Sequence, residues 1–143
     1  MCRTSCWVLL AFLSSWSWNL QPAKDAPKPA SDGLVSTWGA TVSSIRLTAG
    51  GYMIDFRYKV LDPEKAAPLG RRENKAYRVD ESTGAKFLVP TTPKVGSLRQ
   101  APKKLDAGKT YFVFFCNPGK YLKAGSTVTV VIGDFRAEHL VLE

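Results

Sequence analysis

Two clusters of basic side chains are the residues of this 143-residue chain best suited to binding chemistry. Their members are Arg71, Arg72, Lys75, Arg78, Lys94, Arg99, Lys103 and Lys104. Clustered cations attract anionic partners. The clusters lie in or beside two long polar connections, residues 62–75 and 90–109. If the connections meet at one end of the fold, they predict a single positive patch; the alternative is solvated loop charge.

The overall charge points to the same class of partner. Twenty Lys and Arg against twelve Asp and Glu give a net charge of +8. Such a balance favours an anionic envelope component or an acidic protein, although net charge by itself also serves solubility. Nucleic acid is disfavoured, because its binding platforms interleave aromatic side chains with cations. The nearby Tyr77 and Phe87 alternate with their neighbours as core residues do.

Histidine, cysteine and methionine are too few for a transition-metal or haem site. Once an N-terminal leader is removed, only His139, Cys116 and Met53 remain. A copper site needs two histidines and a cysteine, zinc needs three or four ligands, and haem attachment needs a Cys-x-x-Cys-His motif. We therefore expect no cofactor.

Five acidic residues in or beside predicted loops offer the hard oxygen atoms that calcium prefers. They are Asp62, Glu64, Asp80, Glu81 and Asp134. No loop has calcium-binding spacing, so solvated carboxylates are the better interpretation.

Catalytic motifs are also missing from the sequence. There is no Gly-x-Ser-x-Gly elbow, no phosphate-binding glycine loop and no nucleophile with an evident base. Cys116 could in principle pair with His139, but it lies in the most apolar run, where cysteines are usually inert. We predict that the protein is not an enzyme.

The N-terminal residues have the pattern of an export signal. Arg3 precedes an apolar run over residues 6–13, and Ser15 and Ser17 offer a small-x-small cleavage pattern. We predict a signal peptide over residues 1–17, and therefore a secreted or periplasmic protein. The alternative is an uncleaved segment that tethers the protein to the membrane.

A short linker follows the predicted signal. Residues 18–33 are rich in Pro, Ala and Lys, although cleavage near residue 23 would shorten this segment. The folded domain is predicted over residues 34–143. Cys116 is its only cysteine, so we expect no internal disulfide and a fold held by its core.

The first half of this domain has the alternation of antiparallel strands. A strand over residues 35–47 places Trp38 on the core face, and its pattern slips by one residue at Ser43, which predicts a β-bulge. Residues 52–61 alternate most regularly, with charged side chains on the outer face. Residues 76–80 and 85–89 are predicted to form a hairpin.

The connection between these two parts begins with a helix signal. Asp62 is suited to cap a short helical turn, and Pro63 fits its first position.

The last third of the chain contains three apolar runs separated by two turn signals. Residues 111–116 are apolar on both faces, which predicts a central strand covered on both sides, with Phe114 buried. Residues 126–132 and 136–142 follow, and the three runs predict an antiparallel meander. With about seven strands in all, we predict an all-β fold, an antiparallel β-sandwich of the immunoglobulin-like type.

Architecture of this kind hosts many functions. The sequence favours an exported, non-catalytic binding or accessory module that contacts its partner through the basic connections. The alternative is a structural or assembly subunit that pairs through its C-terminal edge strand, residues 136–142.

Overall fold

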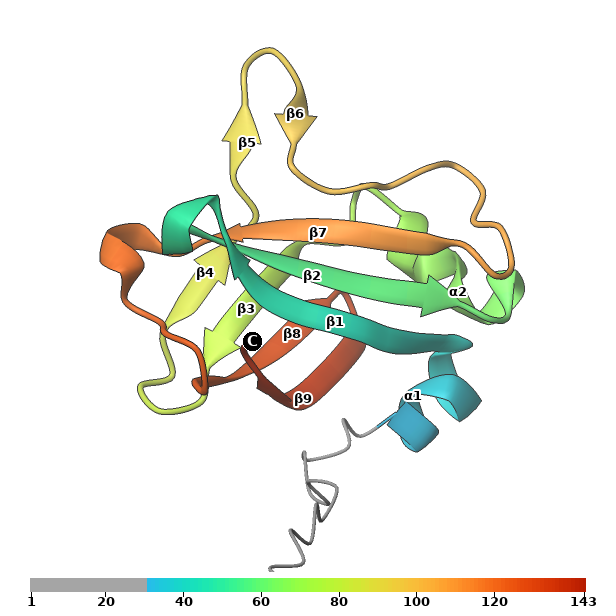
Figure 1. Cartoon of the computed structure of the whole chain (residues 1–143). Coiled ribbons are helices and arrows are strands. Elements are labelled where there is room, and N and C mark those ends of the chain that lie inside the picture. The colour runs from blue at the N-terminus through green and yellow to red at the C-terminus, as the bar shows by residue number, and fades with distance from the viewer. Residues whose placement is uncertain (1–30) are drawn as a thin grey trace, which may run out of the picture.

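The computed structural model describes residues 31–143, which form a mostly antiparallel β fold (Figure 1). The first sheet contains β1 (Ala40–Thr48), β2 (Met53–Val60) and β7 (Thr110–Cys116), in the order β1-β2-β7. The second contains β3 (Ala76–Asp80), β4 (Lys86–Leu88), β8 (Thr127–Ile132) and β9 (Phe135–Val141), in the order β4-β3-β8-β9. A small ribbon pairs β5 (Thr91–Thr92) with β6 (Gly96–Ser97). The all-β prediction is therefore confirmed.

Short helices complete the described part of the chain. They are α1 (Ser31–Trp38), α2 (Pro63–Gly70) and the single turns η1 (Ala49–Gly51) and η2 (Pro118–Lys120). No helix within residues 31–143 has the length and apolar character needed to cross a membrane. The predicted signal peptide, residues 1–17, lies outside the described residues, as does the predicted linker except for its last three residues, which begin α1.

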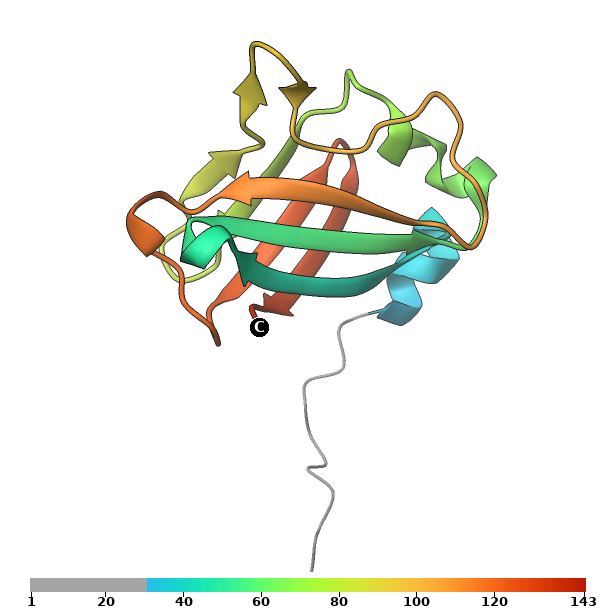
Figure 2. The same ribbon diagram turned by 45° about the horizontal axis from the view of Figure 1, so that its top comes forward.

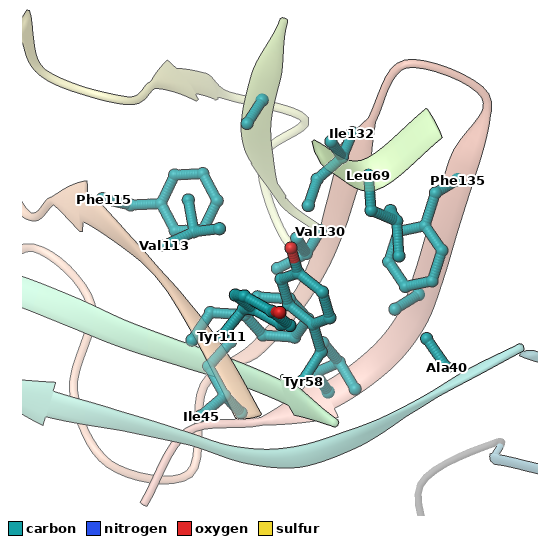
Figure 3. Packing of buried hydrophobic residues seen from close by; sticks show 14 of the residues in the cluster. Ala40, Ile45, Tyr58, Leu69, Tyr111, Val113, Phe115, Val130, Ile132 and Phe135 are labelled. Atoms are coloured by element: carbon teal, nitrogen blue, oxygen red, sulfur yellow. The ribbon is translucent and has the colours of Figure 1, made fainter. Parts of the chain in front are cut away.

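One hydrophobic core receives side chains from both sheets and from the helices. Figure 3 shows aromatic and aliphatic residues of β2 and β7 directed toward those of β8 and β9. Its labelled members include Tyr58, Leu69, Tyr111, Val113, Phe115, Val130, Ile132 and Phe135, all of them buried. Their burial supplies the main stabilising term, because apolar surface removed from water contributes about 25 cal/mol per Å².

Alternation in β2 matches the sequence pattern. Ile54, Phe56 and Tyr58 are buried in the core. On the opposite face, the Arg57 Nε atom lies 2.9 Å from the Asp55 Oδ2 atom, so the expected outer charges pair. Strand β2 is the middle strand of its sheet, which is why it buries nearly all of its inner face.

The first predicted strand begins later than the sequence suggested. Residues up to Trp38 belong to α1, and the chain turns at Gly39, whose φ of +56° favours glycine. A Cβ atom there would lie 2.7 Å from the Asp62 backbone oxygen. Trp38 still packs at the core, edge-on to Phe135 with 5.8 Å between ring centroids. The register of β1 shifts between Val42 and Ser44, which confirms the predicted bulge.

The predicted C-terminal meander is wrong in one respect. Strands β8 and β9 form a hairpin, but β7 belongs to the other sheet and pairs with β2. Its second edge is bridged by residues 98–100, so β7 is covered along both edges by backbone. Only one of its faces is fully buried: Phe115 lies in the core, whereas Phe114 is half-buried on the outer face. Long apolar side chains on that outer face had made the strand resemble a doubly covered one.

The C-terminal residue joins the two sheets. The Glu143 backbone N–H donates to the Ile45 carbonyl at 3.1 Å, and the Leu47 N–H donates to the Glu143 carbonyl at 2.9 Å. This is the pattern of a parallel bridge, so the chain end continues past β9 to lie along β1. The two sheets are therefore connected by hydrogen bonds at this corner.

Truncation of β7 side chains tests its two faces. We expect Phe115→Ala to lower the free energy of unfolding by about 3–5 kcal/mol, because it empties a fully buried site. Phe114→Ala is the matched control and should cost about half as much, since that ring remains partly in water. Urea denaturation of both variants gives the comparison, and equal losses would contradict the assignment of the faces.

Candidate functional site

The two long basic connections lie side by side, although they are distant in the sequence. Helix α2 occupies most of the first connection, so only residues 71–75 are left to join α2 to β3. The second connection contains β5 and β6, and its remaining part, residues 98–109, joins β6 to β7. Figures 1 and 2 show both on the side of the domain from which the β5–β6 ribbon projects. Their close approach requires glycine at position 70, where a Cβ atom would lie 2.9 Å from the Pro102 backbone oxygen.

Arg99 holds the two connections together. Its Nη1 atom donates to the Asn74 carbonyl at 2.6 Å, and its Nη2 atom donates to the Arg71 and Leu69 carbonyls at 2.7 and 3.2 Å. Burial lowers the pKa of Arg99, while the charge interaction with Tyr58 acts in the opposite direction. Because its donors are occupied by backbone, we assign Arg99 a positioning role.

Five of the predicted basic residues are exposed around this junction. We call Arg71, Arg72, Lys75, Lys103 and Lys104 the basic rim. None of them forms an ion pair with a carboxylate within residues 31–143. Glu73 also lies in the first connection and is exposed, but its carboxylate forms no ion pair with a rim cation. Within the described residues, the rim therefore presents five exposed cations that form no ion pair, and Asp106 is the carboxylate whose charge acts on one of them, Lys104.

A cleft opens between the rim and the β5–β6 ribbon. Its volume is about 420 Å³. Arg72, Lys75 and Arg99 line one side, while Leu88 and Val95 contribute apolar surface on the other. Its lining contains no carboxylate. Lys94, the remaining predicted residue, is exposed in the turn between β5 and β6, beside the cleft rather than in its lining.

Arg78 differs from all other members of the predicted set because its side chain is 0% exposed. Its guanidinium stacks over Phe87 at 4.1 Å and donates through Nη2 to the Cys116 carbonyl at 2.9 Å. Desolvation lowers its pKa to about 10, although Asp80 opposes this shift. The alternation along β3 is the sequence signal for this burial, since Arg78 shares a strand face with the buried Ala76 and Asp80.

Three of the five carboxylates considered as calcium ligands, Asp62, Asp80 and Glu81, have hydrogen-bond partners in the fold. Asp62 caps α2 by accepting from the backbone N–H groups of Glu64 and Lys65, as the sequence predicted. Glu81 accepts from the hydroxyl of Thr129 at 2.6 Å and from the backbone N–H of His139 at 2.8 Å. No group of three His, Cys, Asp or Glu side chains within residues 31–143 could hold a metal ion.

Asp80 is the centre of a buried polar network. It accepts from the Ser82 backbone N–H at 3.0 Å and from the hydroxyls of Ser82, Thr83 and Tyr121 at 2.8, 2.6 and 2.9 Å. Burial raises the pKa of Asp80, but these hydrogen bonds outweigh it and lower the pKa to about 2. The network holds the β3–β4 turn against η2 and does not reach the basic rim.

His139 and Cys116, which the sequence raised as a possible pair, lie in different sheets. The His139 Nδ1 atom lies 2.9 Å from the Glu81 Oε2 atom. Cys116 ends β7 in the other sheet, half-buried and opposite Met53. Neither side chain has a hydrogen bond to the other within the described part of the chain.

No family model, curated protein or solved structure matches this chain. The fold and the residues described above therefore carry the functional argument.

Replacement of Arg78 tests its internal role. We expect Arg78→Met, which keeps the volume, to lower the free energy of unfolding by about 1–2 kcal/mol through loss of one hydrogen bond and the stacking on Phe87. Arg78→Ala should cost more because it also leaves a cavity. Thermal melting measures both, and two variants as stable as the wild type would show that Arg78 is not part of the core.

The Asp80 network predicts a dependence of stability on pH. The folded pKa of about 2 lies below the unfolded value of about 3.9, so the charged carboxylate stabilises the fold above about pH 4. That contribution is lost as the pH falls through 4 toward 2. Asp80→Asn should therefore be less stable than the wild type at pH 7, and the difference should shrink near pH 2. Glu73→Gln removes an exposed carboxylate as a control, and a constant difference for Asp80→Asn would contradict the assignment.

Proposed function

We propose that this protein is an exported, non-catalytic binding or accessory module that contacts an anionic envelope component or an acidic extracellular protein. One observation carries the proposal: Arg99 holds two distant connections together, and they present five exposed cations without a described carboxylate partner. A cluster of this kind raises the local concentration of anions and orients their approach.

The geometry of the titratable residues supports a non-catalytic role. Asp80, Glu81 and His139 are engaged in hydrogen bonds that hold turns and strands, and Asp62 caps a helix. Each of these groups is explained by the fold it stabilises. The basic rim, in contrast, has no partner within the described residues that explains its charge.

We also propose that the fold is an immunoglobulin-like β-sandwich. With the β5–β6 ribbon set aside, the strands in chain order form one sheet of 1-2-5 and another of 4-3-6-7. The immunoglobulin constant arrangement has sheets of 1-2-5-4 and 3-6-7. The present order differs from it only in the fourth strand. That strand pairs with the third strand at the edge of the second sheet, instead of with the fifth strand in the first sheet. This similarity supports the proposal.

Export is proposed from the N-terminal sequence, residues 1–17. A secreted or periplasmic location follows if that segment is cleaved, and a membrane tether follows if it is not. A single cysteine in the described domain accords with a fold that does not use disulfides, since Cys116 is free.

The alternative function, assembly through the last strand, has less support. Strand β9 does lie at a sheet edge. However, its register shifts opposite residues 128–130, and His139 has a φ of +56° within it. Arg136 and Glu138 add an exposed ion pair to the same strand. Bulges and charges of this kind are devices that hinder edge-to-edge pairing.

Charge replacement in the rim tests the proposed function. We expect Arg71, Arg72, Lys103 and Lys104, replaced together by Ser, to abolish salt-sensitive retention on a sulfonate resin. The effect arises because clustered charges bind an anionic surface more strongly than dispersed ones.

A second quadruple variant with the same net charge provides the control. It replaces the exposed cations Lys59, Lys120, Lys123 and Arg136, none of which lines the cleft. This control should elute close to the wild type. Equal losses in the two variants would show that net charge, rather than the rim, determines retention, and would overturn the proposal.

A further inference from the structure

The β5–β6 ribbon projects from the body of the domain (Figure 1). Val95, at its turn, is 73% exposed, and Leu88, on the neighbouring β4, is 63% exposed. These are the two most exposed large apolar side chains within residues 31–143, and both line the same cleft. These two side chains give this side of the domain exposed apolar surface in addition to its charge.

Hydrogen bonds within the ribbon hold its turn. The Val95 backbone N–H donates to the Thr92 hydroxyl oxygen at 3.3 Å, and that hydroxyl donates to the Gly96 carbonyl at 3.4 Å. These two bonds fix the turn that carries the exposed Val95 side chain.

Cations surround these apolar side chains. Arg72 and Lys75 line the cleft with Leu88 and Val95, and Lys94 is exposed next to Val95. The rest of the basic rim lies on the same side of the domain, as Figure 2 shows for the connections that carry it. Apolar side chains on a projection with cations beside them resemble the surface of proteins that lie at a lipid–water interface.

We propose that this side of the domain docks on the surface of an anionic lipid bilayer. Val95 and Leu88 enter the boundary between headgroups and acyl chains, and the basic rim and Lys94 pair with lipid phosphates. The inference rests on the proposed function and names its anionic partner. A bilayer is favoured over an acidic protein because Val95 lies in the turn of a projecting ribbon with the exposed Lys94 next to it, so the apolar side chain can enter below the headgroups while the cation stays among them.

Vesicle co-sedimentation tests this inference with the full chain. Vesicles of equal parts phosphatidylglycerol and phosphatidylcholine are compared with vesicles of phosphatidylcholine alone. We expect the wild type to bind the anionic vesicles and not the neutral ones. Leu88→Ser/Val95→Ser should weaken binding about tenfold through loss of apolar burial. Arg71→Ser/Arg72→Ser should weaken it about 30-fold, from about 1 kcal/mol for each cation near the surface.

The matched control is Leu61→Ser/Val141→Ser, which removes one leucine and one valine that are 45% and 38% exposed outside the cleft. All variants share the same N-terminus, so any contribution of that segment to vesicle binding cancels when the variants are compared. The control should bind the anionic vesicles as the wild type does. A loss as large as that of Leu88→Ser/Val95→Ser would overturn the assignment of the docking side.

Failure of this inference can be separated from failure of the proposed function. The quadruple serine variant of the rim separates the two. If this variant loses resin retention but the wild type does not bind anionic vesicles, the proposed function stands and the partner is an acidic protein or polymer instead. If vesicles bind but Leu88→Ser/Val95→Ser has no effect, membrane entry is overturned while charge binding stands. If the rim variant keeps its resin retention, the proposed function fails and this inference fails with it.

Discussion

The guanidinium of Arg99 joins the two basic connections by hydrogen bonds. It donates to three carbonyls of residues 69–74 while its own backbone lies along the edge of β7. One side chain thus determines where two connections lie relative to each other and to the first sheet. Hydrogen bonds from a charged donor are among the stronger ones in proteins, and here all of them go to backbone that would otherwise need water. The position of the basic rim depends on this contact.

Charged side chains in this protein occur both in the interior and on the surface, and the two groups have different contacts. Arg78 is buried on the ring of Phe87, whereas the rim cations have no carboxylate partner within the described domain. Asp80 is buried with four hydrogen bonds. A buried charge without compensation is costly, and these four bonds account for the burial of Asp80, while the Nε and Nη1 atoms of Arg78 are buried without a hydrogen-bond partner among the described residues. Exposed charge without a partner has no such explanation, which is why the rim carries the proposed function.

The side that carries the rim also carries the most exposed apolar side chains. Val95 and Leu88 line the cleft together with Arg72 and Lys75. Each feature alone is common on protein surfaces, where single apolar residues are normal. Their combination around one cleft is more specific. It supports the proposal that the charge of this side serves a surface that is anionic outside and apolar within.

The sequence alone determined the features that depend on neighbours in the chain. The alternation of apolar residues located β2, β3, β8 and β9, and a one-residue slip in that alternation located the bulge after Val42. Asp62 with Pro63 located the start of α2. Side-chain direction and helix capping are local properties, which is why the sequence was sufficient for them. Tertiary structure alone decided that β7 leaves the C-terminal hairpin for the other sheet, since apolar residues on both faces do not specify a partner strand. It also decided that Arg78 is buried, that Arg99 joins two connections, and that the basic rim and Val95 share one side. These outcomes require contacts between distant segments, such as the 25 residues between Arg99 and Asn74 or the 38 between Arg78 and Cys116. The energies of such contacts depend on the whole packed core and cannot be read from any one stretch.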